Sequence, residues 1–163
     1  MIPADEGLLY QLRPATDGDL AFMRVLYGQT REDELAVTGW EREQKEVFID
    51  HQFSAQTAHY HLHMPGAQWH IITLAGEDAG RLVLDHRKGE HRIVDITLHS
   101  GFRGRGTGTA ILRDLQASAA AAGCSLSIHV EHQNPARQLY ERLGFEAKPG
   151  DSEVYQLMEW RSC

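Results

Sequence analysis

Cysteine is scarce in this sequence, and long apolar runs are missing from it. The chain has 163 residues and two cysteines, Cys124 and Cys163, which are too few for a disulfide framework. No apolar stretch approaches the roughly 18 residues that a membrane-spanning helix requires. The first seven residues are acidic and lack the basic start and apolar stretch of a signal peptide. We therefore expect a cytoplasmic protein that has no membrane partner.

Basic residues are also fewer than acidic ones. The chain has 16 lysines and arginines against 23 aspartates and glutamates, which gives a formal net charge of -7. A nucleic-acid groove needs a net basic face, so a nucleic-acid partner is excluded. An acidic chain is compatible with a cationic substrate. The length and the 42% hydrophobic content predict one globular domain over residues 1–163.

The hydrophobic pattern predicts helices and strands in a mixed order. Residues 8–13 read as a strand that Pro14 ends, and Thr16 or Asp17 can cap a helix. Residues 31–63 are mostly helical in pattern, and Pro65-Gly66 ends that region. The strands expected after it span residues 69–74, 80–84, 92–98, 126–130, 145–147 and 153–160, with turns at 75–78 and 87–90. Helices are expected after residue 108 and over residues 134–143, the second with Pro135 at its first position. This order predicts an α/β fold with a mixed, mostly antiparallel central sheet flanked by helices.

The most informative segment is a glycine-rich turn between a strand and a helix, Arg103-Gly104-Arg105-Gly106-Thr107-Gly108-Thr109. Positions without side chains let a ligand approach the backbone closely. The N-terminus of the following helix offers unpaired N–H groups and a positive dipole end, which together favour phosphate. Arg103 and Arg105 can add charge-assisted contacts, and with Arg113 they form a cluster of positive charge in an otherwise acidic chain. The turn has no lysine, which excludes a P-loop, and the dinucleotide spacing from Gly104 lands on Thr109 rather than on a glycine.

Two motifs resemble the signatures of the GNAT acetyltransferase superfamily. Arg103-x-x-Gly106-x-Gly108 is similar to its Arg/Gln-x-x-Gly-x-Gly/Ala signature. The run from Asn134 to Phe145 is similar to its Asn-x-x-Ala-x-x-Leu-Tyr-x-x-x-Gly-Phe signature. It is one residue shorter, so that, counted from Asn134, Ala136 and the matching residues after it stand one position early and Arg137 fills the usual slot of the small residue. The two motifs occur in the family's order about 30 residues apart.

The resemblance implies the GNAT acyltransferase fold and binding of acetyl-CoA as cosubstrate, with residues 92–145 as the binding core. In the family the glycine turn holds the pyrophosphate of CoA, and an asparagine contacts the CoA arm. The implied contacts are Leu98, Arg103, Gly104, Arg105, Gly106, Thr107, Gly108, Thr109, Asn134, Arg137 and Tyr140. Without a ligand, Asn134 would simply cap a helix and Tyr140 would be a core tyrosine.

Transfer of an acetyl group to an amine requires three catalytic actions. The thioester carbonyl must be polarised, the ammonium must lose a proton, and the thiolate must leave. The resemblance places the backbone N–H of Leu98 at the carbonyl and Tyr140 as the acid for the thiolate. Glu131, at the end of the strand before Asn134, is the leading candidate for the base. Asp95 and His129 are alternatives, and each of the three could be a plain surface or sheet residue.

Residues 31–65 carry no family motif, and we expect this helical segment to wall the acceptor pocket. Glu32, Asp33, Glu34 and Trp40 would suit an amine, and would equally suit a solvated helix start with the tryptophan in the core. His59 and His63 have helical spacing, but His61 would point away and no ligand pattern is complete. We expect no metal.

The leading hypothesis is an acetyl-CoA-dependent N-acetyltransferase that acts on a small-molecule or peptide amine. An alternative is a non-catalytic acyl-CoA binding or sensing domain, and a weaker one is a nucleotide-dependent oxidoreductase. The acceptor stays open. The final strand, residues 154–160, is a candidate for pairing with a second subunit in a homodimer.

Overall fold

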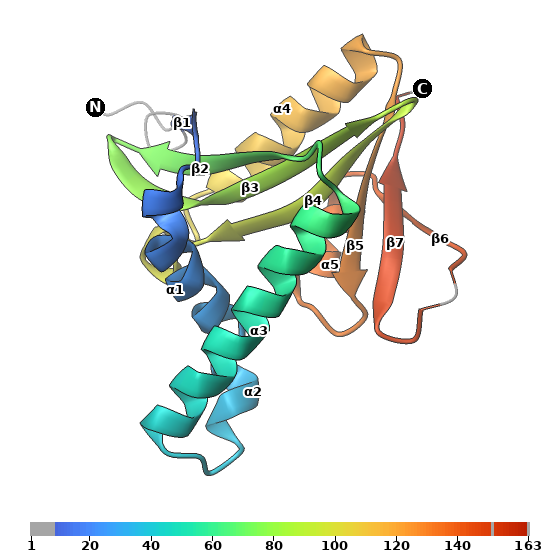
Figure 1. Ribbon diagram of the computed structural model, residues 1–163. Coiled ribbons are helices and arrows are strands. Elements are labelled where there is room, and N and C mark those ends of the chain that lie inside the picture. Colours follow the sequence, from blue (N-terminus) through green and yellow to red (C-terminus); the bar gives the residue numbers. More distant parts are fainter. Residues whose placement is uncertain (1–8, 151, 163) are drawn as a thin grey trace.

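The computed structural model describes residues 9–150 and 152–162, and its centre is one twisted sheet (Figure 1). Within these residues seven strands follow the order β1-β2-β3-β4-β5-β7-β6. Their neighbours are antiparallel except for the pair β4 and β5, which is parallel. This arrangement confirms the mixed, mostly antiparallel sheet that the sequence predicts. The strands are β1 (Tyr10–Pro14), β2 (Gln68–Leu74), β3 (Glu77–Arg87), β4 (Glu90–Leu98), β5 (Ser125–Glu131), β6 (Glu146–Lys148) and β7 (Tyr155–Trp160).

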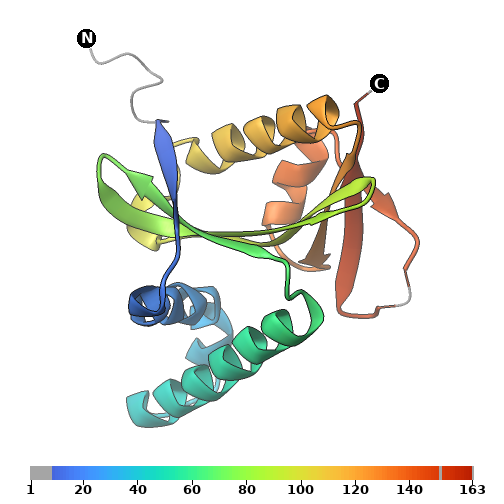
Figure 2. The ribbon, with the colours of Figure 1, turned by 45° about the horizontal axis from the view of Figure 1, so that its top comes forward.

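Helices cover both faces of the sheet, as Figure 2 shows. One layer holds α1 (Leu20–Thr30), α2 (Glu32–Ala36) and α3 (Arg42–His63), and the other holds α4 (Thr107–Ala121) and α5 (Ala136–Arg142). Short 3-10 turns precede α1 (Asp17–Asp19) and follow β4 (Ser100–Phe102). For the roles expected from the sequence, we call the α1–α3 side the acceptor face and the α4–α5 side the carrier face. No helix of the described residues is both long and apolar enough to cross a membrane.

Each face of the sheet has its own apolar core. On the acceptor face Ile71 packs with Met23, Tyr27 and Phe53. On the carrier face Ile72 belongs to a larger cluster that includes residues of α4 and α5. Ile71 and Ile72 are adjacent yet serve opposite cores, because successive side chains of a strand alternate between faces. Both are completely buried, and such burial stabilises the fold by about 1.5–3 kcal/mol for each side chain.

Several predicted element boundaries are wrong. β3 extends well beyond the expected residues 80–84, because two-residue turns at Ala75-Gly76 and Lys88-Gly89 join it to its neighbours. Ala75 and Gly76 have φ angles of 52° and 80°, which permit so tight a turn. Pro14 belongs to β1, since an edge strand tolerates a residue without an N–H. Residue 8 lies outside the described residues.

The C-terminal strand and the helix before it also differ from expectation. β7 lies between β5 and β6, so it is an internal strand, and β6 forms that edge of the sheet. Over residues 157–159, the edge of β7 that was a candidate for pairing with a second subunit is therefore occupied by β6. α5 begins at Ala136, which leaves Pro135 just before the helix rather than at its first position.

The feature that positions the candidate site is the separation of β4 from β5. The two strands pair only over residues 90–93 and 125–128, and their remaining residues point apart (Figure 1). A register shift against β3 leaves Val94 without a partner, and such a bulge bends its strand. We call the gap between residues 95–98 of β4 and residues 129–131 of β5 the wedge. It opens directly before the glycine turn.

Candidate active site

The end of β4 directs backbone polar groups toward the wedge. The N–H of His99 donates to Ala79 O at 2.7 Å, so these two residues form a hydrogen-bonded pair between β3 and β4. Pairs alternate in an antiparallel ladder, so at the neighbouring pair Gly80–Leu98 the polar groups point away from each other. The Leu98 carbonyl indeed points away from β3, since it accepts a hydrogen bond from Arg103 Nε at 2.9 Å. The N–H of Leu98 therefore points to the side from which β5 has departed.

Two of the three glycines in the following turn adopt a backbone conformation that favours glycine, and the third leaves space beside the helix. Gly104 and Gly106 have φ angles of 78° and 80°, in the left-handed region that other residues rarely adopt. Gly108 has no such angle. A Cβ placed there would approach only Leu98 Cδ1, at 4.0 Å, which is ordinary contact. The fold itself would accept a small side chain at Gly108, so its absence keeps space free beside the helix N-terminus.

The N-terminus of α4 presents unpaired donors. The first bond of the helix runs from Ala110 N to Gly106 O at 3.0 Å, so the N–H groups of Thr107, Gly108 and Thr109 lack a carbonyl one turn earlier. The Thr107 hydroxyl is buried and has no hydrogen-bond partner among the residues described. These donors, with the dipole of a 15-residue helix, fit a phosphate group.

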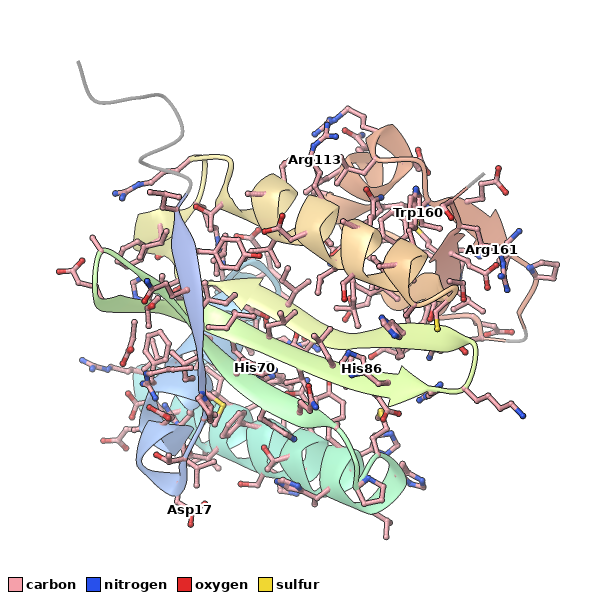
Figure 3. All side chains as sticks on the ribbon, turned by 90° about the horizontal axis from the view of Figure 1, so that it is seen from above. Asp17, His70, His86, Arg113, Trp160 and Arg161 are labelled. Atoms are coloured by element: carbon pink, nitrogen blue, oxygen red, sulfur yellow. The ribbon has the colours of Figure 1, made fainter. Side chains whose placement is uncertain are left out.

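Arg103 and Arg105 lie beside this turn, and each donates to a backbone carbonyl. Arg103 is folded onto the Leu98 carbonyl, and Arg105 donates to Gly101 O at 3.2 Å while its guanidinium lies 5.3 Å from the ring of Phe102. Arg113 extends outward from α4 (Figure 3), about 9 Å of helix rise beyond Thr107. Two arginines therefore border the donors of the turn.

α5 carries the second motif on the carrier face. Asn134 Oδ1 accepts from Ala136 N at 2.9 Å and so satisfies the first N–H of the helix. Arg137 pairs with Glu141 one turn later, with Nε and Oε1 3.2 Å apart. Gly144 ends the helix with a φ of 92°, where a Cβ would lie 3.3 Å from Trp160 Cδ1.

Tyr140 lies on the same helix and is 6% exposed, with its ring edge-on to Phe145 at 5.6 Å. No hydrogen bond of its hydroxyl is found within the described part of the chain. Burial, together with the smaller effect of the nearby charge of Asp95, raises the pKa of Tyr140 to about 12. The phenol is therefore protonated at neutral pH.

On the acceptor face, Glu131 is joined to α1 and α2 by Arg31. Arg31 Nη1 lies 3.4 Å from Glu131 Oε1 and 3.0 Å from Glu34 Oε1, and its Nε donates to the Tyr27 hydroxyl at 3.2 Å. The carboxylate of Glu131 thus lies at the open end of β5. His129 lies back toward the paired part of the strands, where its Nδ1 is 3.0 Å from Arg92 Nη1. Partial burial and the charge of Arg92 lower the pKa of His129.

Asp95, an alternative candidate for the base, belongs to a polar cluster on the acceptor face whose other members, such as Arg81 and Gln29, the sequence motifs did not indicate. Arg81 of β3 donates through Nε to Asp95 Oδ2 at 2.7 Å, and Thr97 Oγ1 donates to Asp95 Oδ1 at 3.0 Å. Gln29 of α1 accepts from Ser100 N at 2.9 Å and lies 3.1 Å from His99 Nε2, which ties α1 to the end of β4. A signal for Arg81 was available, since it is the one charged residue within the otherwise apolar run 79–84.

The remaining predicted positions lie away from the wedge. Trp40 is 40% exposed and packs edge-on against Phe48, so it is not a core residue. His59 and His63 have ring centroids 4.4 Å apart, while His61 stacks on Trp69 at 4.9 Å. No three metal-ligating side chains come together in residues 9–150 and 152–162. His70 and His86 lie apart from these, on β2 and β3 (Figure 3).

Several solved structures of known proteins are similar to this fold. The PaiA N-acetyltransferase of Thermoplasma acidophilum, solved with coenzyme A, superposes with a TM-score of 0.68 at 14% identity over 94% of this chain and 99% of that one. An acetyltransferase of Thermus thermophilus gives 0.65 at 19% identity, over 94% and 97% of the two chains. A GCN5-related N-acetyltransferase of Rhodopseudomonas palustris gives 0.63 at 21%, over 94% and 95%. At such identities these likenesses establish the fold.

The sequence itself provides the family assignment. No curated protein matches it significantly. The model of the acetyltransferase (GNAT) domain matches residues 35–157, which is most of the chain and includes both motifs. This chain belongs to the GNAT family of acetyltransferases.

Proposed function

We propose that this protein transfers the acetyl group of acetyl-CoA to a primary amine by direct attack in a ternary complex. One observation carries the proposal. A strand end with its N–H directed into the wedge runs, within ten residues, into a helix N-terminus with three unpaired N–H groups. One segment of backbone can therefore hold a thioester and a diphosphate at the same time.

The residues of the carrier face fit CoA. The N–H groups of Thr107, Gly108 and Thr109 would bind the diphosphate, with Arg103 and Arg105 turning outward to pair with it. The side-chain-free edge at Gly104, Gly106 and Gly108 lets the diphosphate approach the backbone. Asn134 and Arg137, at the start of α5, would contact the arm that runs along the wedge.

The chemistry assigns one role to each of three groups. The N–H of Leu98 donates to the carbonyl oxygen of the thioester, where negative charge develops during attack. Tyr140 donates its proton to the departing thiolate, whose thiol has an ordinary pKa of about 8.5. Glu131 accepts the proton of the amine, directly or through water, at the open end of β5.

The test is thiol release from acetyl-CoA with a panel of primary amines, together with calorimetry of CoA binding. We expect heat of binding with CoA, none with NAD, and release with at least one amine. CoA binding without release for any amine would favour the sensing domain. No heat with CoA at millimolar concentration would remove both functions.

A further inference from the structure

An ion pair on the acceptor face stands at the edge of the wedge. Arg81 contacts Asp95 Oδ2 through both Nε and Nη2, and Thr97 Oγ1 donates to the other carboxylate oxygen. The two partners differ in exposure, since the side chain of Arg81 is 3% exposed and that of Asp95 is 20% exposed. The guanidinium is thus enclosed, and the carboxylate keeps an open side.

Arg81 is held from α3, and among the described residues its Nη1 is buried without a hydrogen-bond partner. Its Nη2 donates to Gln56 Oε1 at 3.0 Å, and its guanidinium lies 5.9 Å from the ring of Phe53 and 5.5 Å from that of Trp69. A planar guanidinium fixed on several sides holds its carboxylate partner in one orientation. The part of Arg81 is therefore to orient Asp95 and to balance its charge.

Tyr60 of α3 packs beside this ion pair, since its ring lies 5.9 Å from that of Trp69, and the Arg81 guanidinium lies 5.5 Å from the same Trp69 ring. Burial raises the pKa of Tyr60 on α3, and the charge of Asp95 raises it further. The same charge adds to the raised pKa of Tyr140 on α5. Tyr60 and Tyr140 belong to opposite helical layers. Asp95 comes after the last residue of β4 that pairs with β5, and so stands at the β4 edge of the wedge, which an amine from the acceptor face must cross to reach a thioester.

We propose that Asp95 binds the ammonium group of the acceptor, that the Tyr60 hydroxyl is its second contact, and that Arg81 is the positioning residue for Asp95. The inference rests on the proposed function for its acceptor, an amine. A primary ammonium carries three N–H donors, which a carboxylate and a phenol oxygen can accept. Glu131 is then left to take the proton once the ammonium is in place.

Charges beside the wedge define the class of acceptor. Arg31 lies between Glu34 and Glu131, so one cation stands between two carboxylates. The net negative charge there attracts a cation and repels an anion. The acceptor is therefore a primary amine without a carboxylate beside the amino group, such as an alkylamine, and α-amino acids are excluded.

The experiment measures amine binding without chemistry. Butylamine and glycine are titrated calorimetrically into the protein saturated with CoA, which has no acetyl group to transfer. We expect wild type to bind butylamine and not glycine. Loss of a charge-assisted bond in Asp95→Asn should weaken butylamine binding by roughly tenfold to a hundredfold, with CoA affinity unchanged. Asp85→Asn is the matched control, since Asp85 also pairs with an arginine, Arg87, but at the far end of β3.

A second pair of variants covers the case in which Asp95→Asn does not fold because Arg81 is left unpaired. Tyr60→Phe removes one oxygen and should weaken butylamine binding about threefold to tenfold. Arg81→Lys keeps the charge but loses the fixed geometry. We expect it to raise KM for the amine while KM for acetyl-CoA stays constant, which a purely structural role would not do.

The outcomes separate this inference from the proposed function. Butylamine binding that is equal in wild type, Tyr60→Phe and any folded Asp95→Asn protein overturns the inference, even where acetyl transfer persists. No binding of butylamine by wild type also overturns it, as does equal binding of glycine. Butylamine binding that depends on Asp95 or Tyr60 supports the inference. If no amine is acetylated by such a protein, the proposed function is wrong while the inference stands.

Discussion

The carrier face and the acceptor face of this protein build their sites in different ways. On the carrier face the donors are main-chain N–H groups, at Leu98 and at the start of α4, and the side chains are mostly absent. On the acceptor face the groups are side chains from separate elements, such as Arg31, Arg81 and Asp95. A site made of backbone groups requires glycines at fixed spacing, so it can be recognised as a motif in the sequence. A site made of side chains that meet only after folding has no such motif.

The largest effect that we expect from a single substitution is on the carrier face. Tyr140→Phe should lower kcat about 10³-fold, because the thiolate loses its proton donor, and CoA affinity should stay within about threefold. The pKa of Tyr140 is about 12, so the phenol stays protonated throughout the assay range and the loss should be equal at every pH from about 6 to about 10. The measurement is the pH dependence of kcat for both proteins. Tyr10→Phe is the control, since the Tyr10 hydroxyl bonds to Asp114, far from the wedge.

The next effect tests whether the acceptor face also takes part in proton transfer. Glu131→Gln should lower kcat about 10²-fold at neutral pH and remove the acid limb of the pH–rate profile, because that limb reports protonation of the base. Glu34→Gln removes the other carboxylate beside Arg31 and should keep the limb. A profile of unchanged shape in Glu131→Gln would exclude Glu131 and return Asp95 and His129 as candidates.

A smaller effect is expected where a side chain is added to the backbone site. Gly108→Val should weaken CoA binding by roughly 1–3 kcal/mol, because the new methyl groups occupy the space beside the helix N-terminus. The fold should tolerate the change, since a Cβ at Gly108 meets only ordinary contact. Calorimetry with CoA and thermal unfolding without it separate the two effects. Ser118→Val adds the same side chain at an exposed position of α4, and should leave the affinity unchanged.

The same contrast explains how far sequence reasoning reached. The glycine turn, the helix after it and the succession of strands along the chain were predicted correctly. These features depend on residues that are neighbours in the sequence: glycines at a turn, and apolar residues that alternate along a strand. The polar ends of β3 were missed, since exposed residues there carry no apolar signal. The pairing of Arg81 with Asp95 depends on the register of β3 against β4, which a bulge at Val94 shifts. Arg31 and Glu131 are 100 residues apart, and only the folded chain brings them together.

The smallest effect concerns what holds the acceptor face in place. Asp19, at the start of α1, accepts from Thr16 N at 2.8 Å and from Arg13 of β1 at 2.8 and 3.0 Å, so it ties the helix to the sheet. Asp19→Asn should lower the free energy of unfolding by about 1–2 kcal/mol at pH 7, as the loss of a helix cap does. Kinetic constants should change little, because no catalytic group is touched.

The pH dependence of that loss gives the stricter test. The Arg13 guanidinium and then the Thr16 N–H lower the pKa of Asp19 from its ordinary 3.8 to about 2. A carboxyl with a lowered pKa stabilises the folded state above its ordinary pKa, and this contribution is lost as the pH falls toward the folded-state value. The difference between wild type and Asp19→Asn in urea unfolding should therefore be full at pH 5–7 and shrink between about pH 4 and pH 2. Asp17→Asn, at an exposed position of the same turn, should show no such difference. A loss at Asp19 that stays constant down to low pH would mean that the carboxylate charge does not join α1 to β1, and that the other contacts of the acceptor face, such as the bond from Ser100 N to Gln29, hold the helix on the sheet.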